Sequence, residues 1–258
     1  MKATVIISVY KNVRALEAIL RSLKQQTEQD FELIISEDGE CPEMASFMSE
    51  YAFPWPTRHL TQEDLGWRKN RALNAAVVAA QSEWLIFVDG DCVLHPRFVE
   101  MHVRNRAPHV VLAGKRVKLN EALSERVMRG QKIRLWPYLI HKRGCALVEE
   151  GFFVPIAKWL RRPVRHLTGS NMSMAKADLM AINGFDEHYT LPAIGEDLDI
   201  EWRLPANGCR IVSLRNLAVQ YHLYHPENWV DDSVNMAYFN EKKRRNQIVC
   251  THGIRTIQ

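Results

Sequence analysis

Two aspartates one residue apart stand at the end of an apolar run near the middle of the chain. Residues 84–88 are typical of a buried strand, and Asp89, Gly90 and Asp91 follow directly. Ionised carboxylates are costly to bury without a partner, so this pair suits a site better than a core. In an extended backbone the two side chains point to the same side, where their oxygens could bind Mg²⁺ or Mn²⁺. Asp-Gly is also a common turn pair, so the tripeptide alone leaves a plain turn open.

A second acidic pair, Glu196 and Asp197, follows Gly195 and opens a predicted helix. The dipole at a helix start favours an ionised carboxylate, so Asp197 could accept the proton of an attacking hydroxyl as a general base. Either acid could instead cap the helix. Two histidines, His222 and His225, follow a late predicted strand, and imidazole suits Mn²⁺ better than Mg²⁺. A lone histidine is more often structural, so both roles stay open.

The composition is that of an ordinary globular protein: 258 residues, 47% of them hydrophobic and 25% charged. A chain of this length forms one large α/β domain or two small ones. No apolar segment approaches the ~20 residues that a membrane span needs, and residues 1–8 lack the features of a secretory signal. The five cysteines are scattered without C-x-x-C spacing, which indicates neither a zinc site nor a disulfide framework. We therefore expect a cytoplasmic location.

The net charge of +4 is mild, but basic residues concentrate in residues 126–165, where Trp, Tyr and Phe lie between them. Such a segment could hold the protein peripherally on the cytoplasmic face of a membrane, or bind a polyanion. It could equally be a solvated helical face whose apolar side packs inward. The Lys-Lys-Arg-Arg run at 242–245 allows the same alternatives.

Strands and helices alternate in the first third of the chain. This alternation implies a mostly parallel, doubly wound sheet, in which ligands bind beyond the carboxyl ends of the strands. Tyr10, Asp38 and Asp89 each follow a predicted strand, so we expect them to converge on one crevice. The predicted strands are 4–9, 31–36, 58–61 and 84–88. One predicted helix begins at Lys11 or Asn12, and two others cover residues 43–51 and 67–81.

The second half of the chain is less regular. We expect a helix from Glu196 that stops near Pro205, because proline usually ends a helix. No internal repeat or linker is present, so one domain over residues 1–258 is the economical interpretation. The other predicted elements are helices at 121–134 and 176–182, a loop and then a strand in 165–175, and short strands at 110–113, 116–119, 209–213 and 217–221.

Taken in order, these motifs resemble those of family 2 inverting glycosyltransferases with the GT-A fold, in particular the galactosyltransferase and chondroitin-polymerase subset. Any one motif is weak, but their order and spacing together are specific. The resemblance runs from Val5 to about Asn228. The matching segments are residues 5–12, 37–39, 62–74, 89–91, 184–187 and 195–204.

This resemblance implies an α/β, Rossmann-like GT-A fold with a mostly parallel central sheet flanked by helices. It implies a nucleotide-sugar-binding half over residues 1–115 and an acceptor-binding half with a C-terminal extension over residues 116–258. The implied activity moves a sugar from a nucleotide diphosphate, preferably UDP, to a hydroxyl of a glycan or lipid-linked oligosaccharide in cell-surface polysaccharide synthesis. Mn²⁺ or Mg²⁺ would be the cofactor, and we expect no nucleic-acid partner.

The metal ligands follow from the same comparison of motifs. Asp91 is expected to bind the ion directly, with Asp89 on the ribose or sharing the ion. The chondroitin-polymerase type carries a metal-binding histidine in a similar Tyr-His step, which favours His222 as the distant ligand. His225 is the competing choice. An ion held there would neutralise the departing diphosphate.

The remaining roles concern the donor and the acceptor. Asp197 is expected as the general base, and a single base implies direct displacement with inversion at the anomeric carbon. Glu196 is expected to assist it or to hold the acceptor sugar, and Asn171 to touch a sugar. A carboxylate at Asp38 suits the N3–H donor of uracil. The other donor-site candidates are Ser8, Tyr10, Asp64, Gly90 and two arginines with the fork geometry that matches phosphate, Arg68 and Arg71.

Two alternative functions are weighed against this one. A nucleotidyltransferase that forms sugar nucleotides would share the strand–turn–helix pattern, but the chain has no early glycine-rich, basic loop for a triphosphate. A non-catalytic module that binds polyanions or membrane surfaces would use residues 126–165, but it leaves the acidic motifs at 89–91 and 195–197 unexplained.

Overall fold

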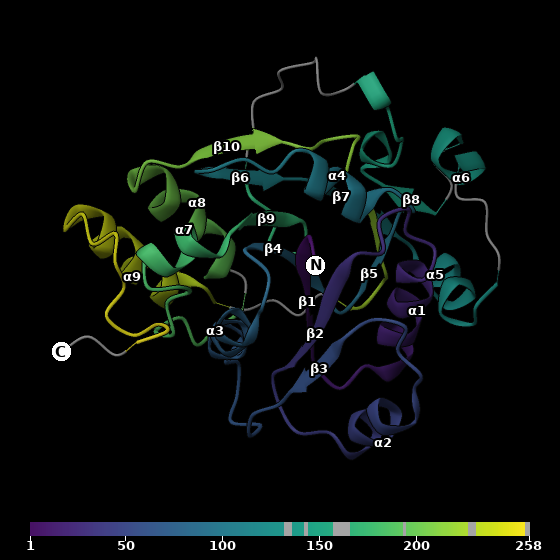
Figure 1. Ribbon diagram of the computed structural model, residues 1–258, viewed down its shortest axis with the longest axis horizontal. Helices are drawn as coiled ribbons and strands as arrows, with labels where there is room; N and C mark the ends of the chain where they lie inside the picture. Colours follow the sequence, from purple (N-terminus) through teal and green to yellow (C-terminus); the bar gives the residue numbers. More distant parts are fainter. Residues whose placement is uncertain (132–135, 142–143, 157–165, 193–194, 227–230, 256–258) are drawn as a thin grey trace.

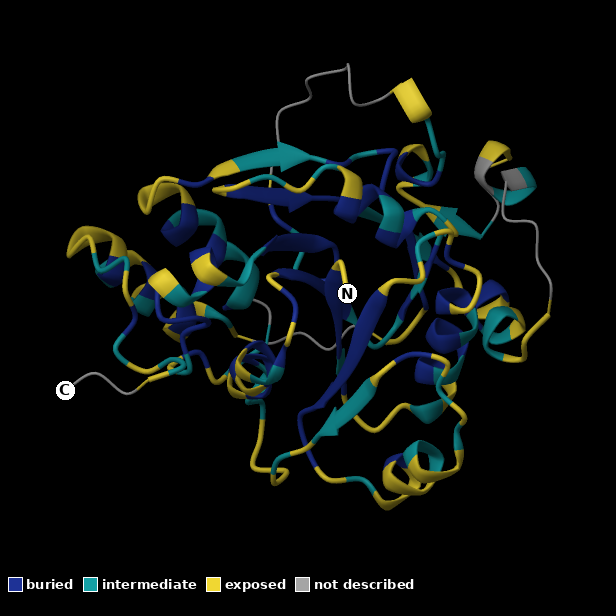
Figure 2. Ribbon diagram, in the orientation of Figure 1, coloured by how far each residue is buried: buried dark blue, intermediate teal, exposed yellow. Residues whose placement is uncertain are grey.

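A computed structural model describes residues 1–131, 136–141, 144–156, 166–192, 195–226 and 231–255. These residues form two sheets, one of seven strands and one of four, with helices packed around them (Figure 1). Buried residues concentrate in the sheets and on the helix sides that face them (Figure 2). The α/β class expected from the sequence is confirmed.

Seven strands form the larger sheet: β1 Ala3–Val9, β2 Phe31–Glu37, β3 Thr57–Leu60, β4 Trp84–Asp89, β6 Val110–Ala113, β9 Met172–Ala175 and β10 Arg210–Ser213. Their order across the sheet is β10-β6-β9-β4-β1-β2-β3. All neighbours are parallel except β9, which is antiparallel to both β4 and β6. The mostly parallel sheet is therefore confirmed.

Both faces of this sheet are covered, which explains why β1, β2, β4 and β6 are mostly apolar. Successive strand residues point to opposite faces, so Val5 and Ile7 of β1 pack in one hydrophobic cluster and Ile6 packs in another. Helices α1 Val13–Leu23, α2 Pro42–Glu50 and α4 Phe98–Arg104 contribute to the first cluster. Helices α3 Lys69–Ala79, α7 Lys176–Ala181 and α8 Glu196–Ala206 contribute to the second.

The smaller sheet was not expected from the sequence. It consists of β5 Cys92–Leu94, β11 Val219–His222, β7 Lys115–Leu119 and β8 Cys145–Ala146, in that order. Strand β5 follows Asp91 directly and pairs with β11 so that Cys92 lies opposite His222. Three residues are too few to show a strand period in the sequence. This pairing brings a late histidine to the end of β4.

Most expected helices are confirmed, with a few corrections. The helix predicted over 121–134 is too long, because α5 covers only Glu121–Met128 and Gly130 follows with a left-handed φ of 73°. Pro205 lies in the last turn of α8, as expected, and Gly208 forms the exit turn. The elements that sequence analysis missed include α4, α6 Trp136–Ile140, the 3₁₀ turn η1 Val148–Glu150 and α9 Ser233–Arg244.

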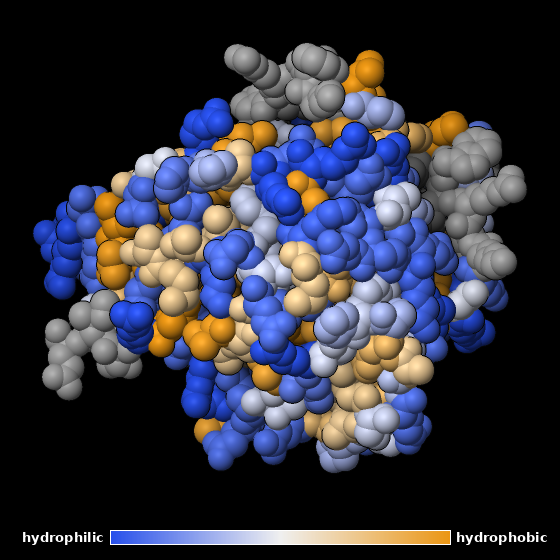
Figure 3. Space-filling model, viewed as in Figure 1, coloured by the Kyte–Doolittle hydropathy of each residue, from blue (hydrophilic) through white to orange (hydrophobic). Residues whose placement is uncertain are grey.

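The basic segment at residues 126–165 stays a prediction, because residues 132–135, 142–143 and 157–165 lie outside the described part of the chain. The face shown in Figure 3 is covered mainly by hydrophilic residues, with hydrophobic ones in small groups between them. Within the described ranges, each helix is too short or too polar to cross a lipid bilayer.

The second basic run, at 242–245, corrects an expectation. Lys242 on α9 is not on a solvated or membrane-facing surface but only 1% exposed. Its ammonium lies 2.5 Å from Asp186 Oδ2 and 2.7 Å from Asp199 Oδ1. Arg203, also buried, donates to the other oxygen of Asp199 at 2.5 Å. Two cations and two carboxylates thus balance each other and fasten α9 to the start of α8.

We expect Lys242→Met to destabilise the fold by about 3–5 kcal/mol, because it leaves a buried carboxylate without its partner. Urea unfolding followed by circular dichroism measures the change. Lys243→Met on the same helix is the matched control, since Lys243 is exposed. Equal stability of the two variants would contradict the role of Lys242.

Candidate active site

The chain turns sharply after β4, at Gly90. Its N–H donates to the carbonyl of Ser8 at 2.7 Å, and a Cβ at this position would lie 2.8 Å from the same oxygen. Only glycine allows the turn to approach β1 so closely. Asp89 and Asp91 therefore leave β4 beside Ser8, at the carboxyl edge of the sheet, where α/β folds bind ligands.

One ammonium group joins acids from the two halves of the chain. Lys69 Nζ donates to Asp89 Oδ1 at 2.7 Å and to Glu196 Oε1 at 2.6 Å. Burial alone would lower the pKa of Lys69, but the two carboxylates outweigh it and raise the pKa above its usual value. Lys69 thus stays charged and connects the end of β4 with the start of α8. Sequence analysis assigned it no role, although it lies within the matching segment 62–74.

A second cation, Arg116 on β7, lies beside the same acids and was also missed. Its Nη1 is 4.0 Å from Asp89 Oδ2. Burial would raise the pKa of Glu196, but Lys69 and, more weakly, Arg116 bring it below its usual value. The Arg116 charge also lowers the pKa of His225 slightly, so its effect reaches the neighbourhood of Asp91.

Asp197 lies beside Glu196 but accepts its hydrogen bond from the backbone, from the N–H of Leu198 at 2.8 Å. Burial, and then the charge of Glu196, raise the pKa of Asp197 to about 6. A carboxylate with this pKa is ionised at neutral pH and still takes up a proton readily, as a general base must. The N-cap of α8 is Gly195, which has no side chain to cap the helix, and the Asp197 carboxylate satisfies one N–H of the first turn, so the capping alternative stays beside the role of a base.

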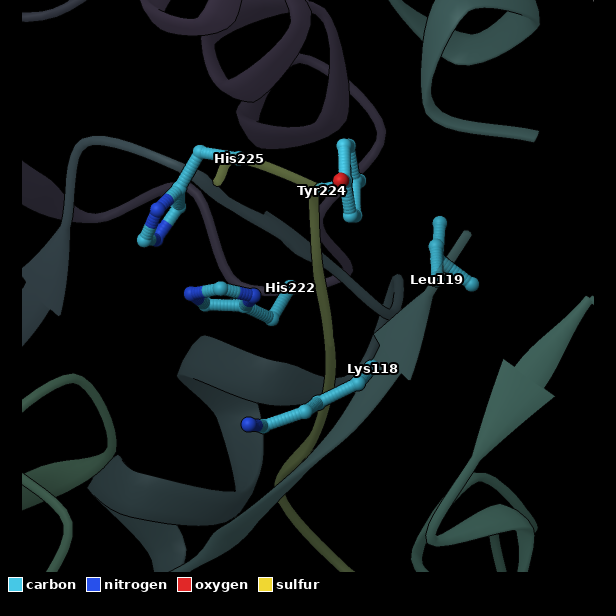
Figure 4. A pocket seen from close by; sticks show the side chains of 5 residues that line it. All are labelled: Lys118, Leu119, His222, Tyr224 and His225. Atoms are coloured by element: carbon cyan, nitrogen blue, oxygen red, sulfur yellow. The ribbon is translucent and has the colours of Figure 1, made fainter. Parts of the chain in front are cut away.

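Asp91 faces two imidazoles. Its Oδ2 lies 3.2 Å from His222 Nε2 and 3.4 Å from His225 Nε2, and one ligand atom from each residue falls within 4.8 Å of the others. One carboxylate oxygen and two imidazole nitrogens fit a divalent transition metal such as Mn²⁺. The two histidines line a pocket of about 320 Å³ together with Lys118, Leu119 and Tyr224 (Figure 4).

The positions of these side chains bear on the two histidines and on Asp89. Both His222 and His225 reach Asp91, so neither excludes the other. Asp89 lies outside the set, because its oxygens face Lys69 and Arg116. Its expected share of the ion therefore does not fit its position, whereas a contact with the donor ribose stays a prediction. The hydrogen bond to Asp91 raises the pKa of His225 to about 9.

Asp38, the expected base contact, is buried and held from two sides. Its Oδ2 accepts from the N–H of Arg68 at 2.7 Å, and its Oδ1 accepts from Gln62 Nε2 at 2.6 Å. The Arg68 guanidinium donates to the carbonyl of Glu63. The segment before α3 is thereby fixed against the end of β2.

Tyr10 and Asp64 meet beside this carboxylate. The Tyr10 hydroxyl donates to Asp64 Oδ2 at 3.4 Å, and Lys11 donates to the same oxygen at 2.5 Å. Both side chains lie next to Gly39, where an added Cβ would be 3.4 Å from the Tyr10 ring. The structure therefore brings Tyr10 and Asp64 together beside Gly39, next to Asp38 in the chain. Tyr10 and Asp38 were expected to converge from their places after strands, and Asp64 was a candidate to line the same pocket.

One expected site residue is placed and another is corrected. Arg71 is exposed on α3, two residues beyond Lys69 and therefore on a different side of the helix, and its expected contact with the donor diphosphate stays a prediction. Asn171 is fully buried. Its amide donates to the carbonyls of Lys115 and Ala218 at 2.8 and 2.9 Å, and its Oδ1 lies 3.1 Å from His102 Nε2. Asn171 therefore fastens the starts of β7 and β11 rather than contacting a sugar.

A family model described as glycosyl transferase family 2 matches residues 4–179, which is more than half of the chain. The chain belongs to glycosyl transferase family 2. A second model, described as the N-terminal domain of galactosyltransferase, matches residues 152–226. Membership of this family favours glycosyl transfer over the nucleotidyltransferase and non-catalytic alternatives.

Two curated relatives match most of this chain. Validoxylamine A glucosyltransferase of Streptomyces hygroscopicus subsp. jinggangensis (strain 5008) is 27% identical over 233 residues, which cover 80% of this chain and 51% of the relative. Chondroitin synthase of Escherichia coli is 25% identical over 251 residues, which cover 88% of this chain and 36% of the relative. This chain thus spans about half of the length of these relatives, or less.

Solved structures share the fold. The mannosyltransferase PcManGT from Pyrobaculum calidifontis, solved with GDP-Man and Mn²⁺, superposes with a TM-score of 0.63 at 15% identity, over 95% of this chain and 64% of that one. S. aureus TarS 1–349 in complex with UDP-GlcNAc superposes with a TM-score of 0.63 at 17% identity, over 96% and 70%. The family 2 chain has the GT-A fold of these glycosyltransferases.

We expect Lys69→Met to raise the pKa of Asp197 above its value of about 6, because the Lys69 ammonium favours the ionised carboxylate. Carbon-13 NMR of the aspartate carboxyl groups follows this titration, with Asp197→Asn identifying the signal. Arg71→Met, on the same helix but away from the acids, should leave the titration unchanged. An unchanged or lowered pKa in Lys69→Met would contradict the arrangement.

Proposed function

We propose that this glycosyltransferase is metal-dependent and inverting, and that its donor is a UDP-sugar. The observation that carries the proposal is the bridge at the sheet edge. Lys69 joins Asp89 to Glu196, so the metal-ligand set at Asp91 and the base candidate at Asp197 lie on neighbouring segments. Sugar transfer needs charge compensation for the departing diphosphate next to a base for the incoming hydroxyl.

Asp91, His222 and His225 would hold the divalent ion, Mn²⁺ in preference to Mg²⁺ because two ligands are imidazoles. The ion supplies positive charge that offsets the charge of the departing diphosphate. Lys69 and Arg116 add positive charge beside it, and the guanidinium fork of Arg116 matches phosphate oxygens. The structural relative PcManGT was solved with Mn²⁺, which supports a divalent cofactor.

The donor nucleotide rests on Asp38. Each carboxylate oxygen has more than one lone pair, so Asp38 can accept the N3–H of uracil while it keeps its bonds to Gln62 and Arg68. Tyr10 is 56% exposed and lies beside it, where its ring can pack on the base. The fold occurs with UDP-GlcNAc in TarS and with GDP-Man in PcManGT, so the choice of UDP depends on this carboxylate.

Asp197 would act as the base in a single displacement. The acceptor hydroxyl oxygen attacks the anomeric carbon, its proton passes to the Asp197 carboxylate, and the bond from that carbon to the diphosphate oxygen breaks. Attack from the side opposite the leaving group inverts the anomeric carbon. Glu196, held by Lys69, is the candidate to position the acceptor sugar.

The wider setting is also part of the proposal. Residues 1–115 would bind the nucleotide sugar, and residues 116–258 would bind a glycan or a lipid-linked oligosaccharide for cell-surface polysaccharide synthesis. We place the reaction in the cytoplasm, peripherally on the cytoplasmic face of the membrane where the segment 126–165 provides contact. The basic and aromatic composition of that segment supports this placement.

Calorimetry with UDP tests donor and metal together. We expect Mn²⁺ to strengthen UDP binding at least about tenfold, or about 1.4 kcal/mol. Asp91→Asn should lose this gain and keep the weaker, metal-free binding. Asp30→Asn, at the amino end of β2 and away from the site, is the control. An Mn²⁺ effect that persists in Asp91→Asn would remove Asp91 from the ligand set.

Asp197→Asn should keep UDP affinity and lose transfer by about 10²–10⁴-fold, because the amide cannot accept the hydroxyl proton. In the wild type at saturating Mn²⁺, transfer should fall as the pH drops below about 6, where Asp197 takes up its proton. NMR of the product should show the anomeric configuration opposite to that of the donor. Retained configuration, or full turnover in Asp197→Asn, would refute the single-displacement mechanism.

A further inference from the structure

Three metal-ligating side chains from distant parts of the chain meet at a second place. His109 directly precedes β6, Cys209 directly precedes β10, and Asp178 lies in the first turn of α7. One ligand atom of each lies within 4.8 Å of the other two. Strands β6 and β10 are parallel and lie side by side (Figure 1), so their amino ends meet. Asp89 stands at the carboxyl end of β4, so this cluster lies at the opposite edge of the sheet.

The backbone holds two of these residues in place. The N–H of Arg210, next to Cys209, donates to the carbonyl of His109 at 2.8 Å. His109 has a left-handed φ of 55°, and its ring turns back so that Nδ1 lies 2.8 Å from Asp178 Oδ1. The imidazole side chain is 73% exposed, which leaves the cluster open to ions from solvent.

One oxygen of the Asp178 carboxylate contacts His109, and the other has no hydrogen-bond partner within the described ranges. Asp178 is 6% exposed, and this second oxygen, Oδ2, is buried. A buried carboxylate oxygen without a partner costs about 1–3 kcal/mol or more. A bound cation would satisfy it. Such an orphan oxygen points to a ligand rather than to a closed ion pair.

The thiol of Cys209 lies against this carboxylate. Cys209 is only 6% exposed, and its sulfur falls within 4.8 Å of the ligand atoms of His109 and Asp178. Its negative neighbour favours a bound cation, which replaces the thiol proton when it binds.

We propose that His109, Asp178 and Cys209 bind a divalent cation, with Zn²⁺ as the best match, and that water completes the coordination. One sulfur, one nitrogen and one carboxylate oxygen form a zinc-type ligand set, whereas Mg²⁺ and Ca²⁺ prefer oxygen alone. The ion would cross-link β6, β10 and α7 away from the donor site. The absence of C-x-x-C spacing does not exclude such a site, because each ligand comes from a different element.

Zinc titration of the full chain in the Asp91→Asn background tests the proposal, since that substitution disables the ligand set at His222 and His225. We expect one Zn²⁺ per chain. Co²⁺ in place of Zn²⁺ should give a sulfur-to-metal charge-transfer band. Adding Cys209→Ser should abolish this band and weaken zinc binding at least about 100-fold, more than the loss of an outer-shell partner does.

Two further variants keep the test decisive. His109→Asn should weaken zinc in the same way without harming the fold, because residue 109 is exposed and asparagine tolerates its positive φ. Cys41→Ser, at a half-buried cysteine before α2, should bind zinc like the parent. Equal zinc affinity in all variants, or no zinc retained by the folded parent, would overturn the proposal.

Discussion

The arrangement of this site depends on one cation, the ammonium of Lys69, between two carboxylates. A glycosyltransferase of this fold gathers acidic residues at one sheet edge, where like charges repel one another. Lys69 binds Asp89 and Glu196 at 2.7 and 2.6 Å and so offsets part of this repulsion. Arg116 offsets more. Asp197 is left beside Glu196 with its pKa raised to about 6, which is the state that a base requires.

The bridge holds only if α3 and α8 keep their positions, and buried polar groups secure both helices. On α3, Asn74 exchanges two hydrogen bonds of 2.8 Å with the backbone of Phe185. On α8, Arg203 and Asp199 form a buried ion pair that Lys242 extends to α9. Breaking a buried pair is costly because it leaves a charge without compensation. Helix α9 thus supports the start of α8, where the candidate base Asp197 lies.

The sequence predicted many residues of the candidate site, because these residues lie at the ends of predicted strands or at a helix start. Asp91 and Asp197 were recognisable from acidic motifs next to a buried strand and a helix start. Lys69 was not, because its role depends on which side of α3 faces the sheet. Arg71 on the same helix was expected to reach the donor diphosphate, which stays a prediction. Asn171 was misassigned, because the neighbouring residues in the sequence do not show that its amide donates to buried backbone carbonyls.

The amino-acid sequence by itself determined the α/β class, the buried strands and the order of the acidic motifs. These depend on local hydrophobic pattern and residue type, which any window of the chain displays. Only the tertiary structure decided the partners: Lys69 between two halves, His222 opposite Cys92, and His109, Asp178 and Cys209 at one edge. Partners of this kind come from packing between elements far apart in the chain, and neither spacing nor composition records which side chains that packing brings together.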